Sequence, residues 1–266
     1  MIAVLSPPKT QEQIIDRLLQ TVSPSRLSCW SKCRLQFWFR YVVKIEKPPT
    51  AALHVGTSIH AVLKQWNKAR WQKEKLTLKQ LYDLLIEAWK EQPKGIKWEG
   101  EEANQQKAAW ALLDTYARQT PIPADERPEA VEVEAEAELE PGLPILRGVL
   151  DLVRANKVIV DFKTSSKSPN PELVIHTTEI QLTSYAVLYR TATGERENGL
   201  ELHHLVKGKN PKLVVTSAPP ITGQQETRLL RTIQSYANGL ENRDIIPSPG
   251  IHCTSCEFFN QCRLWC

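Results

Sequence analysis

The chain has 266 residues, of which 41% are hydrophobic, so it can fill a proper core and is not disordered as a whole. Its longest apolar runs fall short of the ~18 residues of a membrane span, and its first residues, MIAVLSPPKTQEQ, lack the pattern of a signal peptide. We therefore expect a cytoplasmic protein with no membrane partner. In that compartment the six cysteines favour metal or cluster ligation over disulfides.

The formal net charge of +4 is unevenly distributed along the chain. Residues 124–140 carry eight acids and one base, which leaves the remainder distinctly basic. Residues 26–47 and 64–97 each carry a net charge of +5 and interleave basic residues with Trp, Phe and Tyr. Such stretches suit single-stranded nucleic acid, where cations follow phosphates and rings stack on bases. The alternative is a solvated helix face with the aromatic residues in the core.

The first half of the chain is predicted to be mainly helical, from apolar residues that recur at helical spacing. One helix is expected to start at Ser23-Pro24-Ser25 and to continue towards Tyr41. Further helices are expected from near Thr57, over 77–92 and over 101–118.

At Val131 the hydrophobic period changes to two, which is typical of a half-exposed strand. The apolar positions that alternate with glutamates are Val131, Val133, Ala135, Ala137 and Leu139. The elements expected after this strand are strands over 145–153 and 157–163, a helix over 178–192, strands over 200–207 and 212–216, and a helix over 223–241. This order predicts an α/β or α+β fold, with helices on the faces of a sheet.

Two carboxylates and a lysine are expected to meet on neighbouring strands. Asp161 and Lys163 are two residues apart, so their side chains leave the same face of a strand. Asp151 and Asp161 are equidistant from Asn156, and a turn centred there places them directly opposite each other. Cross-strand neighbours of this kind are close enough for both carboxylates to reach one Mg²⁺. Such a site polarises a phosphodiester while the lysine orients the attacking water.

An ordinary surface strand would produce the same three residues. Asp161, however, follows Val158-Ile159-Val160 in a segment that reads as a central strand. An unpaired carboxylate is costly there unless it binds something.

The order of four short motifs carries a resemblance to a known family. These are Gly56-Thr57-Ser58-Ile59-His60, Gly148-Val149-Leu150-Asp151, Asp161-Phe162-Lys163-Thr164, and Gln181 with Tyr185 in QLTSY. Together they resemble the PD-(D/E)XK nucleases, specifically the RecB-like branch. One departure is that no proline precedes Asp151.

The resemblance implies a divalent metal, Mg²⁺ or Mn²⁺, and a role for each matching residue. The implied metal ligands are His60, Asp151, Asp161 and the Phe162 carbonyl. Lys163 would be the catalytic lysine, beside the catalytic carboxylates Asp151 and Asp161. Gln181 and Tyr185, one helical turn apart, would contact DNA.

The cysteines form a second pattern, Cys253-x2-Cys256-x5-Cys262, while Cys33 lies in the segment SPSRLSCWSKCRLQFWFRY. This segment is similar to the N-terminal segment of RecB-like nucleases that bear a cluster. In those families four such cysteines hold a 4Fe-4S cluster that joins the two chain ends. Spacing alone suits structural Zn²⁺ equally well. Cys29 and Cys266 are surplus to this set.

The resemblance implies a restriction-endonuclease-like α/β core, with a central mixed sheet flanked by helices, a helical N-terminal region and a Cys-rich C-terminal clasp. We expect a single domain over residues 1–266, composed of a helical region (23–120), a catalytic sheet core (128–216), and a helix with the Cys-rich end (223–266). The implied activity is metal-dependent DNA hydrolysis, as an exonuclease on single-stranded DNA ends.

The pathway implied by the resemblance is CRISPR adaptation or DNA recombination and repair. The chain has no GxxxxGK[ST] loop, so it would act alone or with a helicase or CRISPR adaptation proteins as partners. The alternative is a non-catalytic DNA-binding or scaffolding module with a structural metal site of four cysteines.

Overall fold

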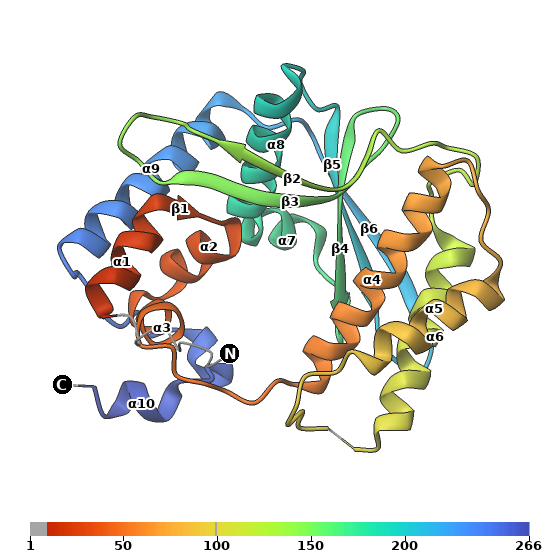
Figure 1. Ribbon diagram of the computed structural model, residues 1–266, viewed down its shortest axis with the longest axis horizontal. Helices are drawn as coiled ribbons and strands as arrows, with labels where there is room; N and C mark the ends of the chain where they lie inside the picture. Colours follow the sequence, from red (N-terminus) through yellow and green to blue (C-terminus); the bar gives the residue numbers. More distant parts are fainter. Residues whose placement is uncertain (1–9, 99, 266) are drawn as a thin grey trace, which may run out of the picture. The chain divides into compact units, whose positions relative to one another are not determined.

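The computed structural model describes residues 10–98 and 100–265, and Figure 1 shows its elements in chain order. Contacts divide the chain into two compact units, each built from segments that are separated in the sequence. The terminal unit takes the described residues of Met1–Lys47, Glu136–Gly148 and Thr222–Cys266. The sheet unit takes those of Pro48–Ala135 and Val149–Ile221. Within the described residues no helix is both long and apolar enough to span a membrane.

The helices of the sheet unit begin at side chains that satisfy free backbone N–H groups. Thr50 accepts a hydrogen bond from Leu53 N at the start of α4, and Thr77 forms a reciprocal capping box with Gln80 at the start of α5. The helices are α4 (Ala51–Trp71), α5 (Leu78–Lys90), α6 (Glu102–Gln119), α7 (Pro171–Thr177) and α8 (Glu179–Thr193).

The strands form a mixed sheet whose order is β1-β3-β4-β5-β6, with β2 also pairing with β3. In the sheet unit β3 and β4 are antiparallel, β4 and β5 parallel, and β5 and β6 antiparallel. The strands are β1 (Thr21–Val22), β2 (Ala130–Ala137), β3 (Ile145–Val153), β4 (Val158–Ser165), β5 (Gly199–Val206) and β6 (Lys212–Ala218). The expected α/β fold with a central mixed sheet flanked by helices is confirmed.

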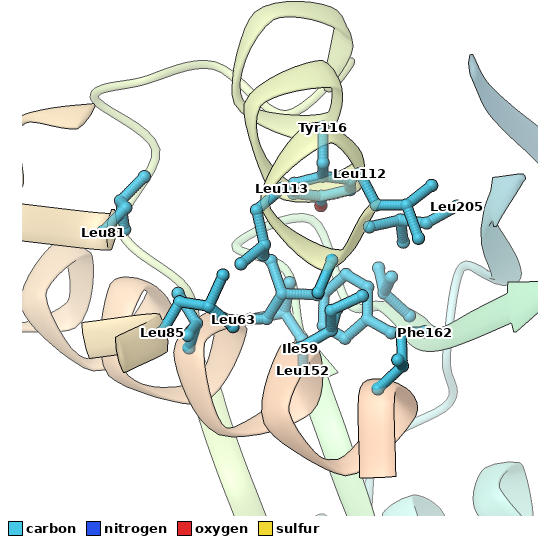
Figure 2. Close-up of a cluster of buried hydrophobic side chains, with 14 of the residues drawn as sticks. Ile59, Leu63, Leu81, Leu85, Leu112, Leu113, Tyr116, Leu152, Phe162 and Leu205 are labelled. Carbon is cyan, nitrogen blue, oxygen red and sulfur yellow. The ribbon is translucent and has the colours of Figure 1, made fainter. Parts of the chain in front are cut away.

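The main core of the sheet unit lies between the sheet and the helices α4, α5 and α6, which cover one face in Figure 1. Phe162 and Leu205 point from the strands into this core, where they meet Ile59, Leu112 and Tyr116 (Figure 2). The helix α8 covers the other face. Alternate residues of β4 therefore enter two different environments, and Asp161 lies on the α8 side.

The terminal unit packs around an aromatic cluster. Trp30, Phe37 and Tyr236 contact one another edge to face, with ring centroids 5.4–5.7 Å apart. A Cβ atom at Gly239 would lie 2.3 Å from the Trp30 ring, so only glycine fits there. The elements are α1 (Gln11–Gln20), α2 (Pro24–Lys32), α3 (Arg34–Phe37), the π-helix η1 (Trp38–Val42), α9 (Gly223–Glu241), the 3-10 helix η2 (Ile251–Ser255) and α10 (Phe259–Arg263), with β1 pairing in parallel with the start of β3.

Two of the expected helices differ from the structure. The helix expected from Ser23 to Tyr41 is interrupted at Cys33, whose backbone is extended and whose thiol accepts a hydrogen bond from Gln36 N at the start of α3. The helix expected near Thr57 begins six residues earlier, at Ala51, because Thr50 supplies the cap. The segments α1, β1 and α7 are additions to the expected elements.

The strict alternation expected along β2 is wrong at its start. Glu132 takes a left-handed backbone conformation with φ 52°. This irregularity leaves Val133 exposed, although it was expected to be buried, and turns Glu132 half inward. Such local irregularities in a strand re-aim a side chain.

Candidate active site

Asp151 and Asp161 lie opposite each other on β3 and β4, as predicted. The observed pairs Leu152–Val160 and Val153–Ile159 continue by one residue to this position. The backbone ladder ends there, because Phe162 N donates to Asp151 Oδ2 at 3.1 Å. The two carboxylates are therefore held together at the point where the strands separate.

The side chain of Lys163 lies on the same face of β4 as that of Asp161, and two polar groups hold its ammonium there. Its ammonium lies 2.8 Å from Asp161 Oδ2 and donates to Gln181 Oε1 at 2.9 Å. Asp161 is only 2% exposed, whereas about a third of the Lys163 side chain is exposed. The lysine can thus be reached from solvent while its carboxylate partner is buried.

Burial is the main influence on Asp151, and the nearby Asp161 carboxylate adds to it. Together they raise the pKa of Asp151 to about 6. His60 and the Phe162 N–H oppose this rise. The raised pKa means that two ionised carboxylates are costly at this site. A bound cation would offset that cost, so the site favours cation binding.

Gln181 and Tyr185 on α8 are held by the carboxylate and the lysine. Gln181 Nε2 donates to Asp161 Oδ1 at 2.9 Å and contacts the Tyr185 hydroxyl at 2.8 Å. Tyr185 is 9% exposed, and burial with the charge of Asp161 raises its pKa. These contacts indicate that both residues position Asp161 and Lys163. The expected contact with DNA stays a prediction.

His60 approaches the site from α4. Its Nδ1 lies 3.5 Å from Asp151 Oδ2, and its ring contacts the edge of Phe162. A Cβ atom at Gly56, one turn earlier, would lie 3.2 Å from Thr164 Oγ1. The glycine of the GTSIH motif thus allows α4 to approach β4 closely enough for His60 to reach Asp151.

Glu132 is a further acidic residue of this site. The alternation of apolar residues and glutamates in β2 predicted that it would be exposed. Its side chain is 19% exposed and lies 3.3 Å from Lys64, one helical turn beyond His60 on α4. Its charge also contributes to the raised pKa of Asp151. The alternation of residues 131–139 gives no sign of this inward turn, because the irregular backbone alone produces it.

His204 is also close to the site. It pairs with Lys163 across β4 and β5, so the two side chains share a face of the sheet. It is 6% exposed, its Nδ1 has no hydrogen-bond partner in the described chain, and burial lowers its pKa. A neutral imidazole therefore lies beside the lysine.

The donors at this site fit a hard divalent cation. Carboxylate oxygens are the ligands that Mg²⁺ and Mn²⁺ prefer. Asp161 Oδ2 is buried and pairs with the Lys163 ammonium at 2.8 Å, so a cation that binds this oxygen would share it with the lysine. Still, within residues 10–98 and 100–265 no three His, Cys, Asp or Glu side chains are grouped so as to hold a metal ion. The ligand set of His60, Asp151, Asp161 and Phe162 stays a prediction.

The four cysteines of the expected cluster line one cavity in the terminal unit. Cys33, Cys253, Cys256 and Cys262 surround an apolar space of about 40 Å³ together with Phe258. Burial and the other three cysteines raise the pKa of Cys262. The described sulfur atoms are not gathered closely enough to form a ligand group, so the bound group stays a prediction.

The surplus cysteines differ in what the structure describes. Cys29 does not line this cavity. Burial raises its pKa to about 11, and Arg40 Nη1 donates to its sulfur at 3.8 Å. Its thiol therefore stays protonated near neutral pH. Cys266 lies outside the described residues.

The aromatic residues of 26–47 are mostly in the core. Trp30, Phe37, Trp38 and Phe39 are all less than 10% exposed. The expectation that rings in this stretch stack on bases is therefore wrong for these four. These four rings pack into the core, whereas Lys32, Arg40 and Lys44 of the same stretch are exposed to solvent.

The comparisons with known proteins agree with the fold. The model of the PD-(D/E)XK nuclease superfamily matches residues 21–263. A crystal structure of a Eubacterium rectale protein named "Putative exonuclease" has a TM-score of 0.62 at 15% identity, covering 97% of this chain and 94% of that one. This likeness shows the fold.

A second crystal structure, of SSO0001, covers 96% of this chain and 94% of that one at 12% identity and a TM-score of 0.45, which is too distant to support an argument. A search of curated proteins finds no match. The family match extends over nearly the whole chain, and the chain therefore belongs to the PD-(D/E)XK nuclease superfamily.

Proposed function

We propose that this chain is a RecB-like, metal-dependent deoxyribonuclease that acts as an exonuclease on single-stranded DNA ends. The observation that carries the proposal is the arrangement of Asp151, Asp161 and Lys163 on adjacent strands, with Gln181 bonded to both members of the Asp161–Lys163 pair. A buried carboxylate pair with a partly exposed lysine is costly to maintain for stability alone.

In phosphodiester hydrolysis, the residues of the candidate active site would have the following roles. Asp151 and Asp161, with His60 and the Phe162 carbonyl, would hold Mg²⁺ or Mn²⁺, which when bound polarises the phosphodiester. Lys163 would orient the attacking water, because its ammonium is fixed by Asp161 and Gln181 yet reaches solvent. Gln181, supported by Tyr185, would hold the side chains of Lys163 and Asp161 in position relative to each other.

The exonuclease assignment is supported by the name of the structural neighbour, and the preference for DNA by the family. We further propose a role in CRISPR adaptation or in DNA recombination and repair, with a helicase or adaptation proteins as partners. The order of the four RecB-like motifs supports this role.

We also propose that Cys33, Cys253, Cys256 and Cys262 hold a 4Fe-4S cluster, with structural Zn²⁺ as the alternative. The common cavity of these four cysteines supports the proposal. Protein purified without oxygen should be brown and contain iron and sulfide. Cys33→Ser should lose the colour, and Cys29→Ser should keep it. Stoichiometric zinc without iron in protein from iron-supplemented cells would contradict the cluster.

The nuclease is tested with end-labelled single and double strands in Mg²⁺, in Mn²⁺ and in a chelator. Lys163→Ala and Asp161→Asn should each lower the cleavage rate by about 10²–10⁴-fold, while oligonucleotide binding persists. The matched controls are Lys79→Ala and Asp83→Asn, which alter an exposed ion pair. Undiminished cleavage by the Asp161→Asn protein would refute this site. Binding without any cleavage by the wild type would favour the non-catalytic alternative.

A further inference from the structure

A second charged cavity lies within the terminal unit. Its volume is about 720 Å³, and it is lined from α1, β1, α2, η1 and the start of β3. The charged residues in its wall are all cationic: Arg17, Arg26, Arg40, Lys44 and Arg147. Two cavities of the sheet unit differ from it, since one is lined by both Lys68 and Glu129 and the other by Asp83 and Glu87.

Much of this positive charge is not neutralised by the protein. Among the described residues, no carboxylate lies within 4 Å of Arg17, Arg26 or Lys44. Arg26 is oriented by a hydrogen bond to the Thr21 carbonyl at 3.0 Å. These three cations line one hollow and repel each other, and an anion that enters the hollow relieves this repulsion.

The other two arginines form ion pairs that an incoming anion can replace. Arg40 pairs with Glu257, and Arg147 pairs with Glu136. All four side chains are about a third or more exposed, so each pair contributes little to stability. The guanidinium group matches the geometry of a phosphate as well as that of a carboxylate, so a phosphate can replace either glutamate.

The cavity suits the backbone of one strand better than a duplex. A space of 720 Å³ is about 11 Å across, smaller than the ~12 Å major groove of B-DNA alone. Tyr41 is an aromatic residue of its wall, and its ring already packs against Phe37 at 4.7 Å. Recognition here would therefore depend on phosphates and would tolerate any base sequence.

We infer that this cavity, lined by Arg17, Arg26, Arg40, Lys44 and Arg147, binds consecutive phosphodiester groups of a single nucleic-acid strand. The inference rests on the proposed function and adds a substrate-binding site in the terminal unit, which holds none of the residues of the active site.

The test measures binding of a labelled oligothymidylate in a chelator, so that cleavage does not contribute. The variant Arg17→Gln with Lys44→Gln removes two exposed cations from the cavity. Its matched control, Lys32→Gln with Arg231→Gln, removes two exposed cations of the same unit that do not line it. Both variants should unfold at the wild-type temperature.

The cavity variant should bind roughly 25-fold more weakly than the wild type in ~0.1 M salt. The slope of log affinity against log salt should fall by about 1.4, since each single-strand phosphate contact contributes about 0.7. An equal loss in the control variant, or an unchanged slope in the cavity variant, would overturn the inference.

A small substrate separates this site from the proposed function. Bis(p-nitrophenyl) phosphate needs the active site and does not extend into a second one, so the cavity variant should cleave it at the wild-type rate. Weaker oligonucleotide binding by the cavity variant, with no cleavage of any substrate by the wild type, would support this site and refute the proposed nuclease. Loss of cleavage of the small substrate in the cavity variant would overturn the inference.

Discussion

Replacement of Asp151 by asparagine is expected to stabilise the metal-free protein while it abolishes cleavage. Burial and the Asp161 carboxylate raise the pKa of Asp151 from its ordinary 3.8 to about 6. This shift of about 2 units corresponds to about 3 kcal/mol between the protonation states. The side chain is only 14% exposed, so solvent screening reduces the figure modestly.

The sign of the effect follows from the direction of the shift. The folded protein holds the Asp151 proton more tightly than the unfolded chain does. The associated stability is therefore present below pH 4 and is lost as the pH rises through about 6. At pH 8 the Asp151→Asn protein should be more stable than the wild type by up to about 3 kcal/mol, and at pH 5 by about half as much.

Thermal unfolding in a chelator at the two pH values measures the effect. A gain of about 3 kcal/mol raises Tm by about 6 °C or more in a protein of this size. Mg²⁺ or Mn²⁺ should raise the Tm of the wild type and not that of the variant. The matched control is Asp16→Asn, an exposed position on α1, which should change neither. Equal or lower stability of the Asp151→Asn protein at pH 8, or a gain independent of pH, would refute the reasoning.

Two further substitutions test features that the backbone imposes. Glu132→Gln should weaken divalent-metal affinity by about tenfold, read from the metal dependence of Tm, because it removes a negative charge beside the carboxylate pair. Glu134→Gln, on the exposed side of β2, is its control, and equal effects would place Glu132 outside the site. Gly239→Ala should destabilise the protein by about 3 kcal/mol in urea, since its Cβ atom would overlap Trp30. Gly223→Ala, where a Cβ atom meets open space, should leave the urea midpoint unchanged.

Local signals explain the parts of the fold that the sequence predicted well. The register of β3 and β4 follows from the polar turn around Asn156 and from two carboxylates at equal distances from it. The helix α9 and strand β3 have the predicted bounds, because each has a clear period and a marked start. The helix α1 carries such a signal too, in the capping box of Thr10 and Gln13, although it is absent from the predicted elements.

Other features depend on packing and could not be predicted from a local pattern. The backbone at Cys33 is extended because the chain turns between two short helices there. The inward turn of Glu132 depends on a left-handed residue within a strand, which hydrophobic alternation does not indicate. The hydrogen bonds of Gln181 could not be predicted either, because they form only when α8 packs against β4 with Gln181 beside Asp161 and Lys163.

The division of the chain between its two units has a consequence for synthesis on the ribosome. The sheet unit is complete once Ile221 has emerged, whereas the terminal unit also needs Thr222–Cys266. Translation at ~5–20 residues per second separates Lys47 from Thr222 by about 10–35 s. During that interval Trp30 and Phe37 lack the ring of Tyr236 on α9, against which they pack in the folded protein. The nascent protein therefore exposes an apolar surface that a chaperone can shield, while all the residues of its candidate active site have already been synthesised.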